Sequence, residues 1–121
     1  MRRVAPSDPA APYMARASEA AALGDEAAEM SWYRRVLAAW PDHIVAHYNL
    51  ATLHYLRGEW RPAKLHYLEV VTRDGGDGEA WLYLAVSESR LGNRREAREA
   101  LLRVIEIDPA NPWARRALGR P

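Results

Sequence analysis

Four histidines are the side chains in this sequence best suited to metal binding: His43, His47, His54 and His66. His43, His47 and His54 are separated by four and seven residues, so a helix would carry them on one face. Zinc sites, however, combine histidines with cysteines or carboxylates at fixed spacing, and that pattern is absent from this sequence. We therefore expect histidines that pack in the core or lie on the surface, and no metal ion.

Other reactive side chains also lack the neighbours that catalysis needs. The stretch "DGGDGEA", residues 74–80, has neither the lysine nor the preceding strand of a phosphate-binding loop. Glu96 and Glu99 flank arginines and indicate ion pairs on a solvated helix face. No serine has a base and an orienting acid beside it in a motif. The sequence predicts neither an enzyme nor a cofactor.

Composition narrows the class of protein. The chain has 121 residues, 49% of them hydrophobic and 27% charged, which fits one globular domain. A formal net charge of +1 argues against a nucleic-acid partner, and the absence of cysteine excludes disulfides. The first 14 residues are interrupted by Asp8 and prolines, and no stretch is apolar enough to span a membrane. We expect a cytoplasmic protein that does not insert into membranes.

A period of 34 residues organises the elements that position these side chains. Gly24, Gly58 and Gly92 are spaced by this interval. Further columns in the same register are Val36/Val70/Val104, Ala17/Ala51/Ala85, Tyr33/Tyr67/Leu101 and Leu37/Val71/Ile105. Such a period indicates stacked structural repeats.

The sequence of each repeat predicts two helices. In the third, Trp81, Leu84 and Ala85 follow the three- and four-residue steps of one helix face. Gly92 can adopt the left-handed conformation that ends a helix, and Pro109 stops the second helix. No segment alternates apolar and polar residues as a half-buried strand would, so the pattern predicts an all-α protein.

The stretch "AWLYLAVSESRLGNRREAREALLRVIEIDP", residues 80–109, resembles a tetratricopeptide repeat. The residues at the positions that define this family are Trp81, Leu84, Ala85, Gly92, Ala97, Leu101, Val104 and Pro109. The resemblance implies a right-handed superhelical solenoid of three helix-turn-helix units, at about residues 10–43, 44–77 and 78–111, plus a capping helix over 112–119. A flexible N-terminal segment, residues 1–9, would precede this single domain of residues 10–119.

The resemblance also implies that the first helix of each unit lines a concave groove, facing away from the core between the helices. The candidate partner-binding residues are Met14, Ser18, Val45, Tyr48, Asn49, Thr52, Tyr55, Leu82, Tyr83, Val86, Arg90, Trp113 and Arg116. We expect this groove to bind an apolar or amphipathic segment of a partner protein. Of the lysines and asparagines with which some family members hold a carboxylate, only Asn49 has a match, which argues against that ligand.

Three alternatives stay open at this point. The chain could instead be a structural subunit or a self-associating homo-oligomer whose groove or ends are permanently filled. The joint "RDGGDGEA", residues 73–80, is either a tolerated long turn or a hinge. Trp40 and Trp113 have no place in the repeat pattern, so each either shields an end of the domain or touches a partner.

Overall fold

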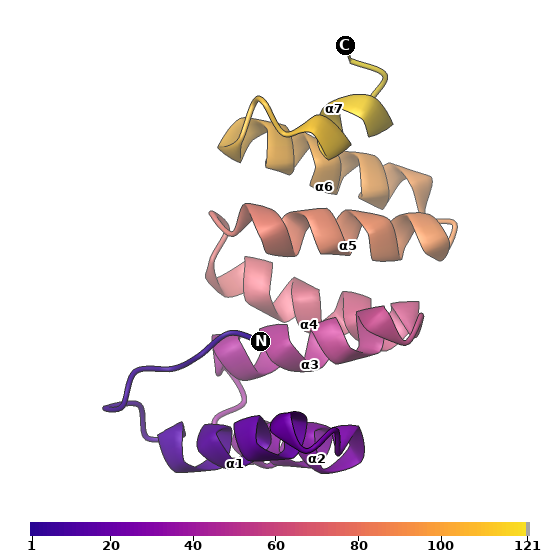
Figure 1. Cartoon of the computed structure of the whole chain (residues 1–121). Coiled ribbons are helices and arrows are strands. Elements are labelled where there is room, and N and C mark those ends of the chain that lie inside the picture. Colours follow the sequence, from indigo (N-terminus) through magenta and orange to yellow (C-terminus); the bar gives the residue numbers. More distant parts are fainter. Residues whose placement is uncertain (121) are drawn as a thin grey trace.

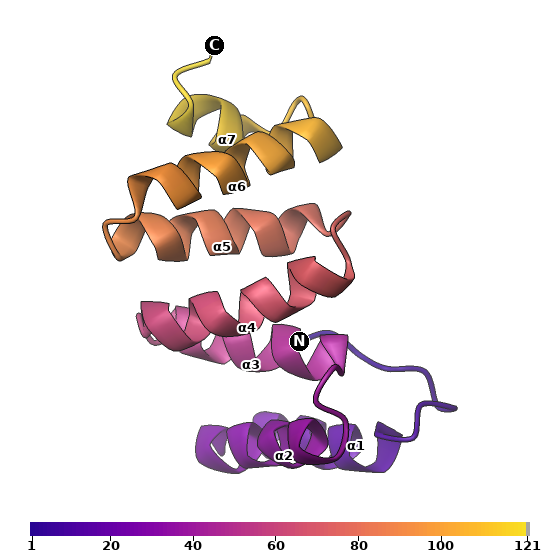
Figure 2. The same cartoon turned by 180° about the vertical axis from the view of Figure 1, so that it is seen from behind.

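A computed structural model describes residues 1–120, which form seven α-helices and no strand. The helices are α1 (Ala11–Ala22), α2 (Glu26–Ala39), α3 (Ile44–Leu56), α4 (Trp60–Arg73), α5 (Gly78–Arg90), α6 (Arg94–Ile107) and α7 (Pro112–Ala117). Consecutive helices pack against one another, so the chain is a solenoid with α1 and α2 at one end and α7 at the other (Figures 1 and 2). The all-α prediction is confirmed.

The same turn ends the first helix of every unit. Gly24, Gly58 and Gly92 have φ of +71°, +71° and +82°, a region that is strained for residues with a Cβ. The next backbone N–H then reaches a carbonyl of the preceding helix over 2.9 Å in all three units. The spacing of the glycines therefore reflects one repeated backbone requirement at a helix C-terminus.

The three joints between units are also alike. Trp40, Asp74 and Asp108 have φ of −131°, −133° and −134°, and each N–H bonds the carbonyl four residues earlier. The joint that contains Gly75 therefore has the same length as the two in which proline stands at that position. It is additionally held by the Trp81 indole N–H, which donates to the Gly75 carbonyl over 2.9 Å. The turn is not longer than its counterparts, and the hinge stays a prediction.

The predicted small and β-branched columns form the core. Val36, Val70 and Val104 are at most 1% exposed, as are Ala46, Ala80 and Ala114, which share the same 34-residue spacing. Alanines at these positions allow close approach of neighbouring helices, where longer side chains would hold the helices apart. The buried side chains gather in one cluster around α1 to α3 and another around α3 to α6.

The segment before α1 follows a defined path. It leaves the start of α1 and runs back to α3, so the N-terminus lies beside the second unit (Figures 1 and 2). Asp8 anchors the segment at its other end, where its carboxylate lies 3.0 Å from His43 Nε2. Residues 1–9, predicted to be flexible, thus contact the first helices of units two and three.

Candidate partner-binding groove

An apolar hollow of about 360 Å³ lies among α3, α5 and α7, toward the C-terminal end. Its walls come from α3, α5 and α7 and consist of Tyr55, Leu82, Tyr83, Val86 and Trp113. The Trp113 side chain is 64% exposed, an unusual state for the largest apolar residue. Five of the candidate groove residues therefore do lie together, on three different helices.

Trp40 and Trp113 have different environments. Trp40 is half-buried, packs against the cluster around α1 to α3 and meets Tyr13 edge-on at 5.9 Å. Trp113, in contrast, has its ring available at the rim of the hollow, with the Arg116 guanidinium 5.9 Å from the ring centre. Trp40 thus shields the core, whereas the Trp113 side chain is exposed.

A row of tyrosines connects the hollow to the rest of the groove. Tyr67 lies at its centre, fully buried, with ring centres of Tyr48, Tyr55 and Tyr83 at 5.8, 6.3 and 5.7 Å. Burial raises the pKa of Tyr67 above its ordinary value, so the phenol stays neutral. Tyr48 is only 4% exposed, because it packs in the core cluster around α3 to α6 and its ring is covered by Arg2.

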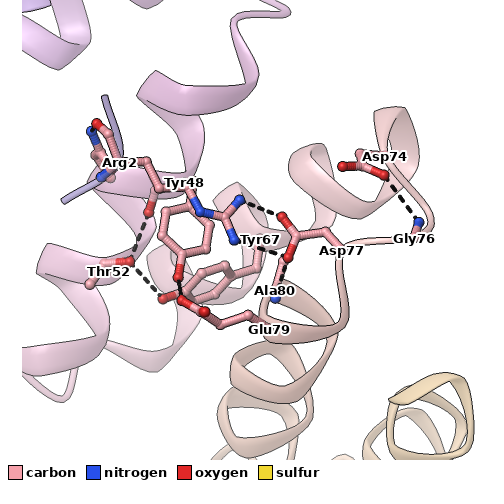
Figure 3. Close-up of polar contacts among 10 residues, drawn as sticks. Arg2, Tyr48, Thr52, Tyr67, Asp74, Gly76, Asp77, Glu79 and Ala80 are labelled. Atoms are coloured by element: carbon pink, nitrogen blue, oxygen red, sulfur yellow. Dashed lines mark hydrogen bonds and ion pairs between the residues drawn. The ribbon is translucent and has the colours of Figure 1, made fainter. Parts of the chain in front are cut away.

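Arg2, near the start of the chain, lies over Tyr48 next to this row (Figure 3). Asn49 bonds the main chain of Arg2 twice, accepting from its N–H and donating to its carbonyl, both over 2.8 Å. The Arg2 guanidinium lies 3.4 Å from the centre of the Tyr48 ring and forms a two-pronged ion pair with Asp77. Tyr48 in turn donates its phenolic hydrogen to Glu79.

The charge balance at Asp77 depends on Arg2. Burial alone would raise the pKa of the Asp77 carboxyl, but hydrogen bonds from Arg2 and from the Ala80 N–H hold it below its ordinary value. Asp77 also caps the N-terminus of α5 through that Ala80 bond of 3.1 Å. One carboxylate therefore starts a helix and binds a cation at the same time.

The remaining candidates lie apart from the hollow. Met14 and Val45 pack in or against the cluster around α1 to α3. The Ser18 hydroxyl donates to the Met1 sulfur over 3.3 Å, and the Thr52 hydroxyl donates to the Tyr48 carbonyl over 2.9 Å. Arg90 lies over the Trp60 ring at 5.4 Å. Met14 is thus a buried core residue, and none of these five side chains lines the hollow.

Comparison with known proteins agrees with this geometry. The tetratricopeptide-repeat family model matches residues 78–120. Residues 78–120 are a tetratricopeptide repeat, and the chain as a whole has the helical solenoid fold. The human FK506-binding protein-like protein is 34% identical to this repeat protein over 80 residues, which are 66% of the chain and 23% of the relative. The chain thus spans about a quarter of that relative's length.

Solved structures share the fold of this repeat protein. The crystal structure of the MamA protein matches with a TM-score of 0.84 and 23% identity, covering 91% of this chain and 60% of MamA. The first tetratricopeptide-repeat domain of Spaghetti (RPAP3), bound to the HSP90 peptide SRMEEVD, matches with a TM-score of 0.78 and 19% identity, covering 93% of this chain and 90% of that domain. At these identities the likeness concerns the fold.

The histidines of the repeat protein form a packed row. His47 Nδ1 lies 3.0 Å from His66 Nδ1, its other nitrogen is 2.7 Å from the Pro41 carbonyl, and His54 bonds Glu59. Burial, followed by the neighbouring His47 and His54, lowers the pKa of His66 to about 4. Within residues 1–120, no group of three or more potential ligands could hold a metal ion. Over the same residues, no helix is long and apolar enough to cross a membrane.

The sequence did not indicate that Arg2 and Asp77 of the repeat protein belong to the groove. They lie 75 residues apart, and Arg2 belongs to a segment that has no periodic pattern. The only local signal was the position of Asp77 three residues before Ala80, where an acidic N-cap is expected. Glu79, two residues further along the chain, completes the acidic side of the site.

Proposed function

We propose that this repeat protein is an interaction module that holds a segment of a partner protein along its concave face. The observation that carries the proposal is the apolar hollow of Tyr55, Leu82, Tyr83, Val86 and Trp113, with the Trp113 side chain 64% exposed at its rim. An exposed tryptophan beside a preformed apolar hollow has the composition of an interaction hot spot.

The hollow selects for a bulky apolar side chain. Its volume of about 360 Å³ accommodates one or two large side chains, and its walls offer aromatic and aliphatic carbon rather than charge. Burying such a side chain contributes about 1.5–3 kcal/mol. An amphipathic segment would therefore place its apolar residue here and its polar residues in solvent. The peptide bound to the Spaghetti domain supports the general role, because that domain shares the fold.

Selection from a random peptide library tests this role without a known partner. Peptides selected on the full chain should contain a large apolar residue and lose binding to Val86→Arg at least tenfold, because the new charge would be buried unpaired. Leu65→Arg on α4 is the matched control, since Leu65 is 55% exposed outside the hollow. It should bind the same peptides normally.

Two results would contradict the proposal. Selected peptides that bind Val86→Arg as well as the wild type would place the binding surface elsewhere. A stable wild-type oligomer in light scattering, from which no peptide is captured, would instead favour the self-associating alternative.

A further inference from the structure

The residues around Arg2 form a site of their own next to the apolar hollow. Asn49 comes from α3, Tyr48 from the same helix, and Asp77 from the cap of α5. In the occupied state Asn49 is 3% and Asp77 8% exposed, so the N-terminal segment fills the site closely. Arg2 thus contacts α3 through its main chain and the cap of α5 through its side chain, as a residue of a bound peptide would (Figure 3).

The site contacts the backbone and the side chain of its occupant through different residues. The Asn49 amide bonds both the N–H and the carbonyl of one residue over 2.8 Å, which requires an extended main chain but no particular side chain. The Asp77 carboxylate and the Tyr48 ring then contact the guanidinium on two sides. A planar cation that donates two parallel hydrogen bonds and stacks on an aromatic ring fits this arrangement, whereas the compact ammonium of lysine does not.

The receptor side is held in place by contacts that do not involve Arg2. Asp77 is fixed by the Ala80 N–H over 3.1 Å. The Tyr48 ring meets Tyr67 edge-on at 5.8 Å and bonds Glu79 through its hydroxyl. When the N-terminal segment leaves, the carboxylate and the ring remain positioned, and the negative charge of Asp77 loses its partner. The empty site therefore favours another arginine.

We infer that Asn49, Tyr48 and Asp77 form an arginine-binding subsite of the groove, and that residues 1–9 are a tethered occupant which an arginine-bearing extended segment of a partner protein displaces. This deepens the proposed function, on which it rests, by adding a charged anchor beside the apolar one. Because the segment is attached to α1, its effective concentration at the subsite is in the millimolar range. A free peptide therefore binds to the subsite only when it displaces the attached N-terminal segment.

The probe for this subsite is a labelled peptide with the sequence of residues 1–9, MRRVAPSDP, titrated into the full chain. Arg2→Ala in the full chain removes the tethered guanidinium and should raise the affinity for the probe at least tenfold. Arg3→Ala is the matched control: it removes the same charge one residue along, from an exposed side chain, and should leave the affinity unchanged.

Two further variants test the chemistry. Asp77→Asn, added to Arg2→Ala, should abolish the gain while keeping the helix cap, because asparagine is as good an N-cap as aspartate. A probe with lysine in place of its second residue should bind the Arg2→Ala chain at least fivefold more weakly than the arginine probe. Circular dichroism of each variant confirms that the helices remain.

Three results would overturn the inference: equal affinity of the probe for the wild type and Arg2→Ala, equal binding of the lysine and arginine probes, or a wild-type dimer that Arg2→Ala dissolves. The last would make a second copy the occupant. Val86→Arg separates the two proposals, because it should not affect this probe. If the library peptides need Val86 but show no preference for arginine, the proposed function holds and the arginine subsite is wrong.

Discussion

The side chain of Asn49 forms two hydrogen bonds with the main chain of Arg2, both 2.8 Å long. This pair joins the start of the chain to the first helix of the second unit, across 47 residues of sequence. Since the two bonds involve only backbone atoms of the segment, they determine where it lies independently of its side chains. A substitution of Asn49 should therefore weaken the docking of residues 1–9, as should a change in the N-terminal segment itself.

Asn49→Ala should release the N-terminal segment. The substitution removes both hydrogen bonds, and at about 1 kcal/mol for each it should increase the population of the undocked segment about tenfold or more. Trypsin cleavage after Arg2 and Arg3, followed by mass spectrometry, measures that population. Leu65→Ala on α4 should leave the cleavage rate unchanged. A cleavage rate in Asn49→Ala equal to that of the wild type would mean that these bonds do not hold the segment.

Trp40 and Trp113 should respond oppositely to truncation. Trp40→Ala opens a cavity in the cluster around α1 to α3 and should lower the free energy of unfolding by about 2–4 kcal/mol. Trp113→Ala removes an exposed ring and should change it by less than about 0.5 kcal/mol, while weakening the library peptides several-fold. Urea denaturation and peptide titration give both quantities. A strongly destabilised Trp113→Ala that binds normally would reverse the two assignments.

Gly75→Pro should stabilise the domain. Proline already stands at the equivalent positions 41 and 109, and the preceding residue Asp74 has the same φ and ψ as Trp40 and Asp108. Restricting the unfolded chain should therefore add about 0.4–1 kcal/mol to the free energy of unfolding. The thermal midpoint of the variant measures this gain.

The same variant tests the hinge at residues 73–80. If this joint bends, Gly75→Pro should narrow the distribution of distances between spin labels on α4 and α5. An unchanged distribution, together with the higher thermal midpoint, would leave a rigid turn. A lower midpoint would show that the backbone around Gly75 does not match the two proline-containing joints.

His66 should make the domain less stable in mild acid. Its pKa of about 4 in the folded chain lies below the ordinary value of 6.5, so the folded state disfavours the proton. Unfolding then takes up a proton between pH 6.5 and about pH 4, and the free energy of unfolding falls as the pH decreases through this window. Below the folded-state pKa, this group causes no further loss.

His66→Gln isolates that contribution, because glutamine does not titrate. Its free energy of unfolding should decline less steeply than that of the wild type between pH 6.5 and 4, with a difference in slope of at most about 1.4 kcal/mol per pH unit. Denaturant titrations at several pH values provide the slopes. Parallel curves for the two proteins would show that His66 is not the titrating group.

The repeat and its core were encoded locally and could be predicted. Gly24, Gly58 and Gly92 marked turns that require a positive φ, and the structure has that φ at each. Val36, Val70 and Val104 shared one column and are all buried. Each of these properties depends on a residue's own helix and its immediate neighbours, so a period of 34 residues was enough to reveal it.

The composition of the groove depended on the tertiary structure. Resemblance to the family placed Tyr48 and Trp113 on one concave face, but only the packing of α3 against α4 and α5 shows that Tyr48 is buried while Trp113 is exposed. The pairing of Arg2 with Asp77 could not be predicted at all, because residues 1–9 have no periodicity that would indicate the path of the segment. A repeat pattern specifies which side of a helix is apolar. Which distant side chains meet across the groove is decided by the way the helices stack and by the route of the chain outside them.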